Sequence, residues 1–248
     1  MSVLNPLRRL RKRWKSFWSV NWIKTYYFNL KMFPFETAKK LPVFIYGNYK
    51  LTDLSGRIII EAPIERGMIG FGHPFEAQTR SRGVGEIVIV GTVKFKGYVH
   101  FGKDVYFQVG KNAYCEMGTF SCLGSQCTLI CRERIIIGDY VRVAYETQLL
   151  DSVFHQLIDL KTNTKKEKTA PITIGNYNWI GNRSTIMKGT ITPDYTTVGS
   201  NSLCNKDYTA LGNHILIGGI PAKLLKTDIT RDWEGEQHIL DNLLRKRI

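Results

Sequence analysis

One histidine stands out among the five in the sequence because of the residues around it. His155 comes four residues after Asp151 and directly precedes a polar run, residues 156–171. A hydroxyl group is a weak nucleophile at neutral pH, and a base that removes its proton during attack solves this problem. Imidazole suits the task because its unperturbed pKa is about 6.5. The sequence therefore indicates His155 as a candidate general base, and a purely structural histidine is the alternative interpretation.

Three residues near His155 are candidates for orienting it or for binding the acceptor. Asp151 is placed to orient the imidazole or to bind acceptor hydroxyl groups, and an exposed carboxylate with neither role is the competing interpretation. Glu146 carries the same ambiguity, and Phe154 is a candidate wall of the acceptor pocket. No cysteine lies beside a histidine. Direct attack of the substrate hydroxyl is therefore favoured over a reaction through a covalent intermediate on the enzyme.

The same residue types argue against a metal site. Zinc catalysis needs about three converging imidazoles, and no two histidines lie close together in this sequence. The cysteines fit no zinc-binding spacing and are odd in number, so we expect reduced thiols, four of which lie in the repeat region and can serve as small apolar filling. They are Cys115, Cys122, Cys127, Cys131 and Cys204. No metal cofactor is expected.

The candidate residues lie on or beside a segment with a six-residue rhythm. Ile174–Trp179 and Ile180–Thr185 are consecutive units, and the rhythm resumes at Val198 and closes at Ile217. An aliphatic residue followed by Gly at a fixed short period is typical of a parallel β-helix. The aliphatic side chain fills the coil, and Gly permits the tight corner between flat strands. We therefore predict an all-β fold, a parallel β-helix built from hexapeptide repeats.

Three regions are expected along the chain. Residues 1–55 are basic and rich in aromatic residues, which favours a helical N-terminal segment with a connector around Pro34 and Pro42. Residues 56–226 are strand-like and punctuated by Gly, and they are assigned to the β-helix. Residues 227–248 have apolar residues at helical spacing and basic residues near the end, which favours a C-terminal helix.

Residues 135–226 resemble the hexapeptide-repeat acyltransferases, and among them the galactoside, xenobiotic and capsular-polysaccharide O-acetyltransferases. The motifs that carry the resemblance are Asp151-Ser152-Val153-Phe154-His155, Asn178-Trp179-Ile180-Gly181, Val198-Gly199-Ser200, Asn205-Lys206-Asp207 and Gly218-Gly219-Ile220-Pro221-Ala222-Lys223. The resemblance is weaker over residues 56–134 and absent before them. It implies a homotrimer of left-handed β-helices with active sites in the clefts between subunits. It also implies transfer of an acetyl group from acetyl-CoA, with His155 as the base.

For the coenzyme, the resemblance points to eight residues: Trp179, Gly181, Asn182, Gly199, Ser200, Asn205, Lys206 and Lys223. Small residues would let the extended pantetheine arm lie along the backbone, and lysines would meet the phosphates as point charges. Backbone N–H groups between Trp179 and Asn182 are candidate donors to the tetrahedral intermediate.

The net charge of +14 is concentrated at the beginning of the sequence. Residues 1–50 hold eleven basic residues and one acidic residue, so 11 − 1 = +10 of the total lies there. No nucleic-acid-binding motif accompanies this charge. The basic residues alternate with apolar residues at helical spacing, namely Leu4, Leu7, Leu10, Trp14, Phe17, Trp18 and Trp22. Residues 1–25 are therefore interpreted either as an interfacial membrane anchor or as a helix that packs on the β-helix or on a neighbouring subunit.

Taken together, these patterns favour a cytoplasmic O-acetyltransferase that uses acetyl-CoA and acts on a sugar hydroxyl of a polysaccharide or glycolipid precursor. The membrane contact, where present, would be on the inner face. No secretory signal is recognised. Three alternatives stay open: N-acetylation of an amino sugar, transfer of another acyl group, and a catalytically silent β-helix scaffold.

Overall fold

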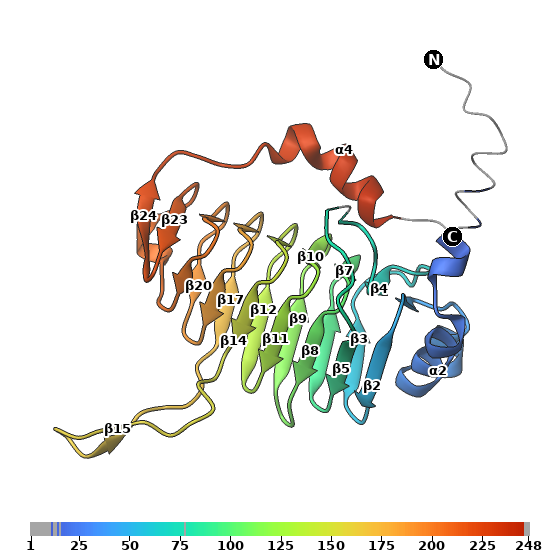
Figure 1. Cartoon of the computed structure of the whole chain (residues 1–248), viewed down its shortest axis with the longest axis horizontal. Coiled ribbons are helices and arrows are strands. Elements are labelled where there is room, and N and C mark those ends of the chain that lie inside the picture. Colours follow the sequence, from blue (N-terminus) through green and yellow to red (C-terminus); the bar gives the residue numbers. More distant parts are fainter. Residues whose placement is uncertain (1–10, 12–13, 15, 77, 246–248) are drawn as a thin grey trace.

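In the computed structural model, the chain winds into a triangular prism (Figure 1). The structure describes residues 11, 14, 16–76 and 78–245. Each turn of the chain contributes one short strand to each of three parallel sheets, and the strands of successive coils pair in register. The predicted all-β fold, a parallel β-helix, is therefore confirmed. The left-handed winding stays an expectation from the resemblance.

The three sheets are the faces of the prism. Face 1 has nine strands: β1 (Val43–Ile45), β4 (Ile69–Phe71), β7 (Val99–Phe101), β10 (Ser121–Leu123), β13 (Arg142–Val143), β18 (Trp179–Ile180), β21 (Thr197–Val198), β23 (Leu216–Gly219) and the antiparallel β24 (Ala222–Lys226). Face 2 has seven: β2 (Tyr49–Asp53), β5 (Gly85–Ile89), β8 (Tyr106–Val109), β11 (Thr128–Cys131), β14 (Gln148–Leu150), β19 (Thr185–Met187) and β22 (Leu203–Cys204). Face 3 has six: β3 (Arg57–Ile60), β6 (Thr92–Phe95), β9 (Tyr114–Met117), β12 (Arg134–Ile137), β17 (Ile172–Ile174) and β20 (Ile191–Thr192).

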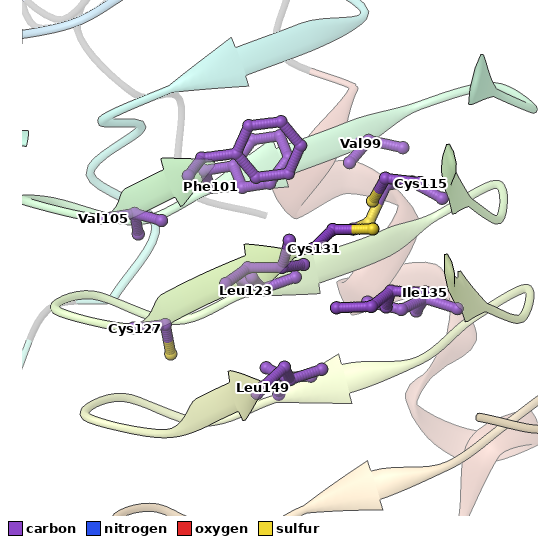
Figure 2. Packing of buried hydrophobic residues seen from close by; sticks show 14 of the residues in the cluster. Val99, Phe101, Val105, Cys115, Leu123, Cys127, Cys131, Ile135 and Leu149 are labelled. Carbon is purple, nitrogen blue, oxygen red and sulfur yellow. The ribbon is translucent and has the colours of Figure 1, made fainter. Parts of the chain in front are cut away.

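Inward-pointing side chains stack in columns, one residue per coil. On face 2, one column consists of Phe107, Leu129, Leu149, Ile186 and Cys204, all fully buried. All five cysteines are free and buried. Four of them, Cys115, Cys127, Cys131 and Cys204, belong to the hydrophobic core, which confirms the prediction of interior filling for these four; Figure 2 shows the first three. Burying an aliphatic side chain contributes about 1.5–3 kcal/mol, so the columns supply most of the favourable free energy of this fold.

The glycines of the repeats allow the backbones of neighbouring coils to approach each other closely. The corner residues with positive φ are not glycines, as Tyr140 (φ 57°) and Tyr177 (φ 53°) show. Gly138, by contrast, comes two residues before Tyr140, and a Cβ there would lie 2.8 Å from the backbone nitrogen of Asn176 in the next coil. The Gly of the repeat is therefore required by the close approach of two backbones, and the left-handed conformation is borne by bulky residues.

The N-terminal segment caps the first coil. Helix α2 (Trp22–Met32) starts at Asn21, whose side chain accepts a hydrogen bond from the Lys24 backbone, and the short α3 (Phe35–Ala38) follows. Strand β1 already pairs with β4, so the prism begins at Val43 and the predicted boundary at residues 55/56 falls inside the first coil. Leu4, Leu7 and Leu10, expected on a helix face, lie outside the described residues.

The C-terminal helix α4 (Trp233–Leu244) lies along one corner of the prism (Figure 1). Six rings from successive coils stack along that corner, and they belong to Tyr98, Phe120, Tyr140, Tyr177, Tyr195 and His214. The Trp233 ring contacts the Tyr177 ring edge-on at 5.8 Å, and the Arg245 guanidinium lies 4.9 Å from the centre of the Phe120 ring. The C-terminal helix therefore contacts several coils and links them along this corner.

Candidate active site

The predicted site residues lie at two different corners of the prism. Corner A joins face 1 to face 2, and corner B joins face 2 to face 3. Within one coil, Glu146 lies at corner A, strand β14 crosses face 2, and Asp151 follows at corner B. An extended chain rises about 3.3 Å per residue, so the two corners are roughly 15 Å apart.

His155 lies at corner B, where the chain leaves the prism. The loop that begins there carries a small hairpin, β15 (Ile158–Asp159) with β16 (Thr164–Lys165), that projects away from the prism (Figure 1). Phe154 adopts a positive φ of 60°, and the rings of Phe154 and His155 are both exposed. The Arg132 guanidinium lies 5.9 Å from the centre of the Phe154 ring. The imidazole is therefore open to a molecule that approaches corner B from outside.

Asp151 has a different position from the one expected. It is fully buried, and its carboxylate accepts hydrogen bonds from three backbone N–H groups of the preceding coil. Oδ1 accepts from Arg132 at 2.7 Å, and Oδ2 accepts from Glu133 at 2.8 Å and from Arg134 at 2.9 Å. These bonds hold corner B together where the loop leaves. The geometry therefore corrects the expectation of an orienting or acceptor-binding residue, because Asp151 clamps two coils.

Glu146 lines a polar groove at corner A with a volume of about 590 Å³. Its Oε1 accepts from Arg82 Nη1 at 2.6 Å, and its Oε2 lies 3.7 Å from Arg183 Nε. Arg82 belongs to the polar excursion after β4, which folds back over successive corners of the prism. This groove is lined by guanidinium groups, a carboxylate and the amide of Gln126. Such groups form hydrogen bonds with hydroxyls and anions.

Trp179 is exposed on face 1 and is contacted by the C-terminal segment. The Arg231 guanidinium lies 5.6 Å from the centre of the Trp179 ring and 4.9 Å from that of the Trp233 ring. Arg231 Nε donates to Glu236 Oε2 at 2.8 Å, which fixes the guanidinium to the first turn of α4. Arg231 is not among the residues predicted from the sequence, and no motif marks it. Only the return of α4 along the prism brings it to Trp179.

Four of the predicted coenzyme residues meet at corner A. Gly181 and Asn182 belong to one coil and Gly199 and Ser200 to the next, and Ser200 Oγ donates to Asn182 Oδ1 at 2.7 Å. A Cβ on Gly181 would lie 2.6 Å from the backbone nitrogen of Ser200. This corner thus presents a narrow strip of small and amide side chains.

The other three predicted coenzyme residues lie elsewhere. Asn205 and Lys206 follow β22 at corner B, where the Lys206 ammonium lies 5.4 Å from the centre of the Tyr208 ring. Lys223 is exposed on β24 and pairs with Gly218 of β23. The single chain therefore does not gather the eight residues into one surface.

Four of the thiols are unsuited to act as nucleophiles. Burial raises the pKa of the Cys204 thiol to about 11, and it also raises the pKa values of Cys115, Cys127 and Cys131. A thiol whose pKa lies well above neutral carries little thiolate. Among the described residues, no cluster of three or more His, Cys, Asp or Glu side chains has the arrangement of a metal site.

No family model matches the chain. The polySia-specific acetyltransferase NeuO superposes with a TM-score of 0.49 at 20% identity over 74% of this chain and 82% of that chain. The acetyltransferase VCA0836 of Vibrio cholerae O1 biovar eltor gives a TM-score of 0.40 at 24% identity over 48% and 61%. A galactoside O-acetyltransferase of Escherichia coli (strain K12) is 26% identical over 142 residues, which are 52% of this chain and 68% of that protein. The chain is therefore similar in sequence to a galactoside O-acetyltransferase, which indicates an acyltransferase.

Gly181 and Gly199 differ in how closely the next coil approaches them. Gly181→Ala should lower the free energy of unfolding by about 1–3 kcal/mol, because the added methyl group meets backbone atoms of the next coil. Gly199→Ala is the matched control, since its nearest neighbour lies 3.7 Å from the added Cβ, and its stability should change by less than about 0.5 kcal/mol. Urea unfolding followed by circular dichroism measures both. Equal losses in the two variants would contradict the packing argument.

Proposed function

We propose that this chain is an O-acetyltransferase that uses acetyl-CoA and acts on a sugar hydroxyl of a polysaccharide or glycolipid precursor. The proposal is carried by the exposed imidazole of His155 at a corner of a β-helix whose relative is a galactoside O-acetyltransferase. The buried cysteines with raised pKa values favour direct attack over an acyl-enzyme. The free thiols also fit a reducing compartment such as the cytoplasm.

The chemistry is a single acyl transfer. His155 accepts the proton of the acceptor hydroxyl as its oxygen attacks the carbonyl carbon of the thioester. A C–O bond forms, and the negative charge on the carbonyl oxygen is stabilised by backbone N–H donors. The tetrahedral intermediate then collapses with cleavage of the C–S bond, and the proton held by His155 passes to the departing thiolate. The products are the acetyl ester and coenzyme A, and atoms and charge balance without a metal.

Binding of the two substrates is assigned to surfaces with matching chemistry. The strip Gly181–Asn182 and Gly199–Ser200 offers an open run of backbone and amide groups for the pantetheine arm. The groove around Glu146 offers a carboxylate and guanidinium groups that suit the hydroxyls of a sugar. Phe154 beside His155 would cover an apolar ring face of the acceptor.

The separation of the two corners supports a homotrimer. His155 lies at corner B, whereas Glu146 and the strip of small residues lie at corner A of the same chain. In a closed ring of three subunits, corner A of one subunit would face corner B of the next. Such a head-to-tail arrangement makes three equivalent sites. Each complete site would then take its base from one subunit and its coenzyme strip from another.

Subunit complementation tests the function and the shared site together. His155→Ala and Trp179→Ala are expected to be nearly inactive alone, and random mixed trimers should recover about a quarter of the wild-type rate, because one site in four receives both intact halves. The assay measures thiol release from acetyl-CoA and the acetylation of a panel of sugars. A product that alkali cleaves is an ester, and one that resists alkali is an amide.

The control is a mixture of the two homotrimers prepared separately, without subunit exchange. Absence of thiol release with every acceptor would reject the acetyltransferase. Activity in both homotrimers with no gain on mixing would reject the shared site. An alkali-stable product would replace the O-acetyltransferase with an N-acetyltransferase.

A further inference from the structure

Helix α2 is held on the prism by a polar inner face. Thr25 and Asn29 are buried, and together they bond the free edge of β1. The Thr25 hydroxyl accepts from the Ile45 backbone at 3.0 Å, and the Asn29 amide donates to the Val43 carbonyl at 2.7 Å. These bonds satisfy backbone groups that an unprotected edge strand would leave open. They also fix which side of α2 faces outward.

The outward side of α2 is apolar. Ile23, Tyr26, Tyr27 and Leu30 follow one another at helical spacing and are all exposed, and Ile23 is 84% exposed. A surface helix normally presents polar residues to solvent. An apolar outer face on a well-anchored helix therefore indicates that another surface covers it.

The apolar surface extends beyond α2 on both sides. Trp14 and Trp18 precede the helix with their ring centroids 6.0 Å apart, and Phe35, 68% exposed, follows it. We call this surface the aromatic cap, and it consists of Trp14, Trp18, Ile23, Tyr26, Tyr27, Leu30 and Phe35. It lies at the N-terminal end of the prism (Figure 1).

The positive charge of the N-terminal region indicates which kind of surface covers the aromatic cap. Residues 1–50 hold eleven basic residues and one acidic residue, and Lys31, Lys39 and Lys40 lie within the segment that carries the aromatic cap. Two caps facing each other would bring like charges together, which disfavours a second copy of this chain. Tyr and Trp between basic residues suit the boundary between lipid headgroups and acyl chains. Basic residues near an anionic leaflet add electrostatic attraction to the insertion of apolar side chains.

We propose that the aromatic cap docks this protein on the surface of an anionic lipid bilayer. The contact is peripheral, and among the described residues no helix is long and apolar enough to cross a membrane. The segment 1–25 named from the sequence supplies only part of this surface, because the outer face of α2 continues to Leu30 and α3 adds Phe35. The proposal does not depend on the acetyltransferase activity.

Co-sedimentation of the full-length protein with vesicles tests the proposal. One set of vesicles is phosphatidylcholine alone, and the other contains about 30% phosphatidylglycerol. The wild type should bind the anionic vesicles, and added salt should weaken the binding. The double variant Ile23→Glu with Leu30→Glu should lower the apparent affinity at least about tenfold, because two inserted apolar side chains become charged. Both residues are exposed, so the thermal midpoint should stay unchanged.

Ile239→Glu is the matched control, since Ile239 is 67% exposed on α4, outside the cap. It should bind vesicles as the wild type does. Wild-type protein that fails to bind anionic vesicles would overturn the proposal, and so would a double variant that binds them normally. Sedimentation velocity adds a third outcome: an assembly that the double variant dissociates would assign the cap to a second copy of the chain and overturn lipid docking.

Discussion

Replacing His155 with alanine is expected to lower the rate of acetyl transfer by about 10²- to 10⁴-fold, the range for loss of a general base. The side chain is exposed at corner B and makes no packing contribution that its loss would remove from the prism. The thermal midpoint and the affinity for coenzyme A, measured by calorimetry, should therefore match the wild type. The rate is followed as thiol release from acetyl-CoA in the presence of acceptor.

His238→Ala provides the matched control, because His238 is also exposed but lies on α4. Its rate should equal that of the wild type. If His155→Ala retained full activity, the proposed base would be rejected. If it lost coenzyme binding as well as turnover, the residue would have a binding role in place of proton transfer.

Replacing Asp151 with alanine is expected to destabilise the fold by about 3–5 kcal/mol, because each buried donor left without an acceptor costs about 1–3 kcal/mol. Three backbone N–H groups, those of Arg132, Glu133 and Arg134, would lose their acceptor inside the protein. Hydrogen bonds to a charged group are about twice as strong as neutral ones. Urea unfolding should show the loss, and the activity per folded molecule should fall much less than in His155→Ala.

Asp159→Ala is the control for this variant. Asp159 also accepts from backbone N–H groups, those of Lys161 and Thr162, but it does so in the projecting hairpin, where the site is exposed to solvent. Its replacement should leave the unfolding midpoint nearly unchanged. An Asp151→Ala protein with wild-type stability and no activity would restore the orienting role that the sequence suggested.

The two candidate residues differ in how visible their surroundings are in the sequence. His155 was predicted as the base because a polar loop interrupts a regular repeat, and that interruption is visible in a linear pattern; its role stays a prediction. The neighbouring Asp151 was misassigned because its partners belong to the preceding coil. Proximity along the chain suggested an imidazole partner, whereas the stacking of coils supplied three backbone donors.

The same distinction applies to the fold. The rhythm from Ile174 onward predicts the β-helix because each coil repeats the same inward aliphatic position. The rhythm is weaker in the first coils because Phe71 and Phe101, whose ring centroids lie 4.3 Å apart, fill the interior in place of aliphatic residues. The prediction therefore missed β1 and β2, which lie before the predicted boundary at residue 56. A column of inward side chains accepts an aromatic residue in place of an aliphatic one where the neighbouring coils also carry large rings. The sequence repeat therefore becomes harder to recognise, although the β-helix continues.

The sequence by itself determined the repeating architecture, the class of chemistry and the identity of the candidate base, since these depend on periodic residue types and on one interrupted unit. Tertiary structure alone decided that Asp151 bonds to the preceding coil, that Arg231 returns to Trp179, and that α2 presents an apolar face to solvent. Each of these depends on contacts between residues distant in the chain. The physical reason is that a short period fixes the direction of every strand, whereas the partners of a polar or aromatic side chain depend on which coil or helix is stacked beside it.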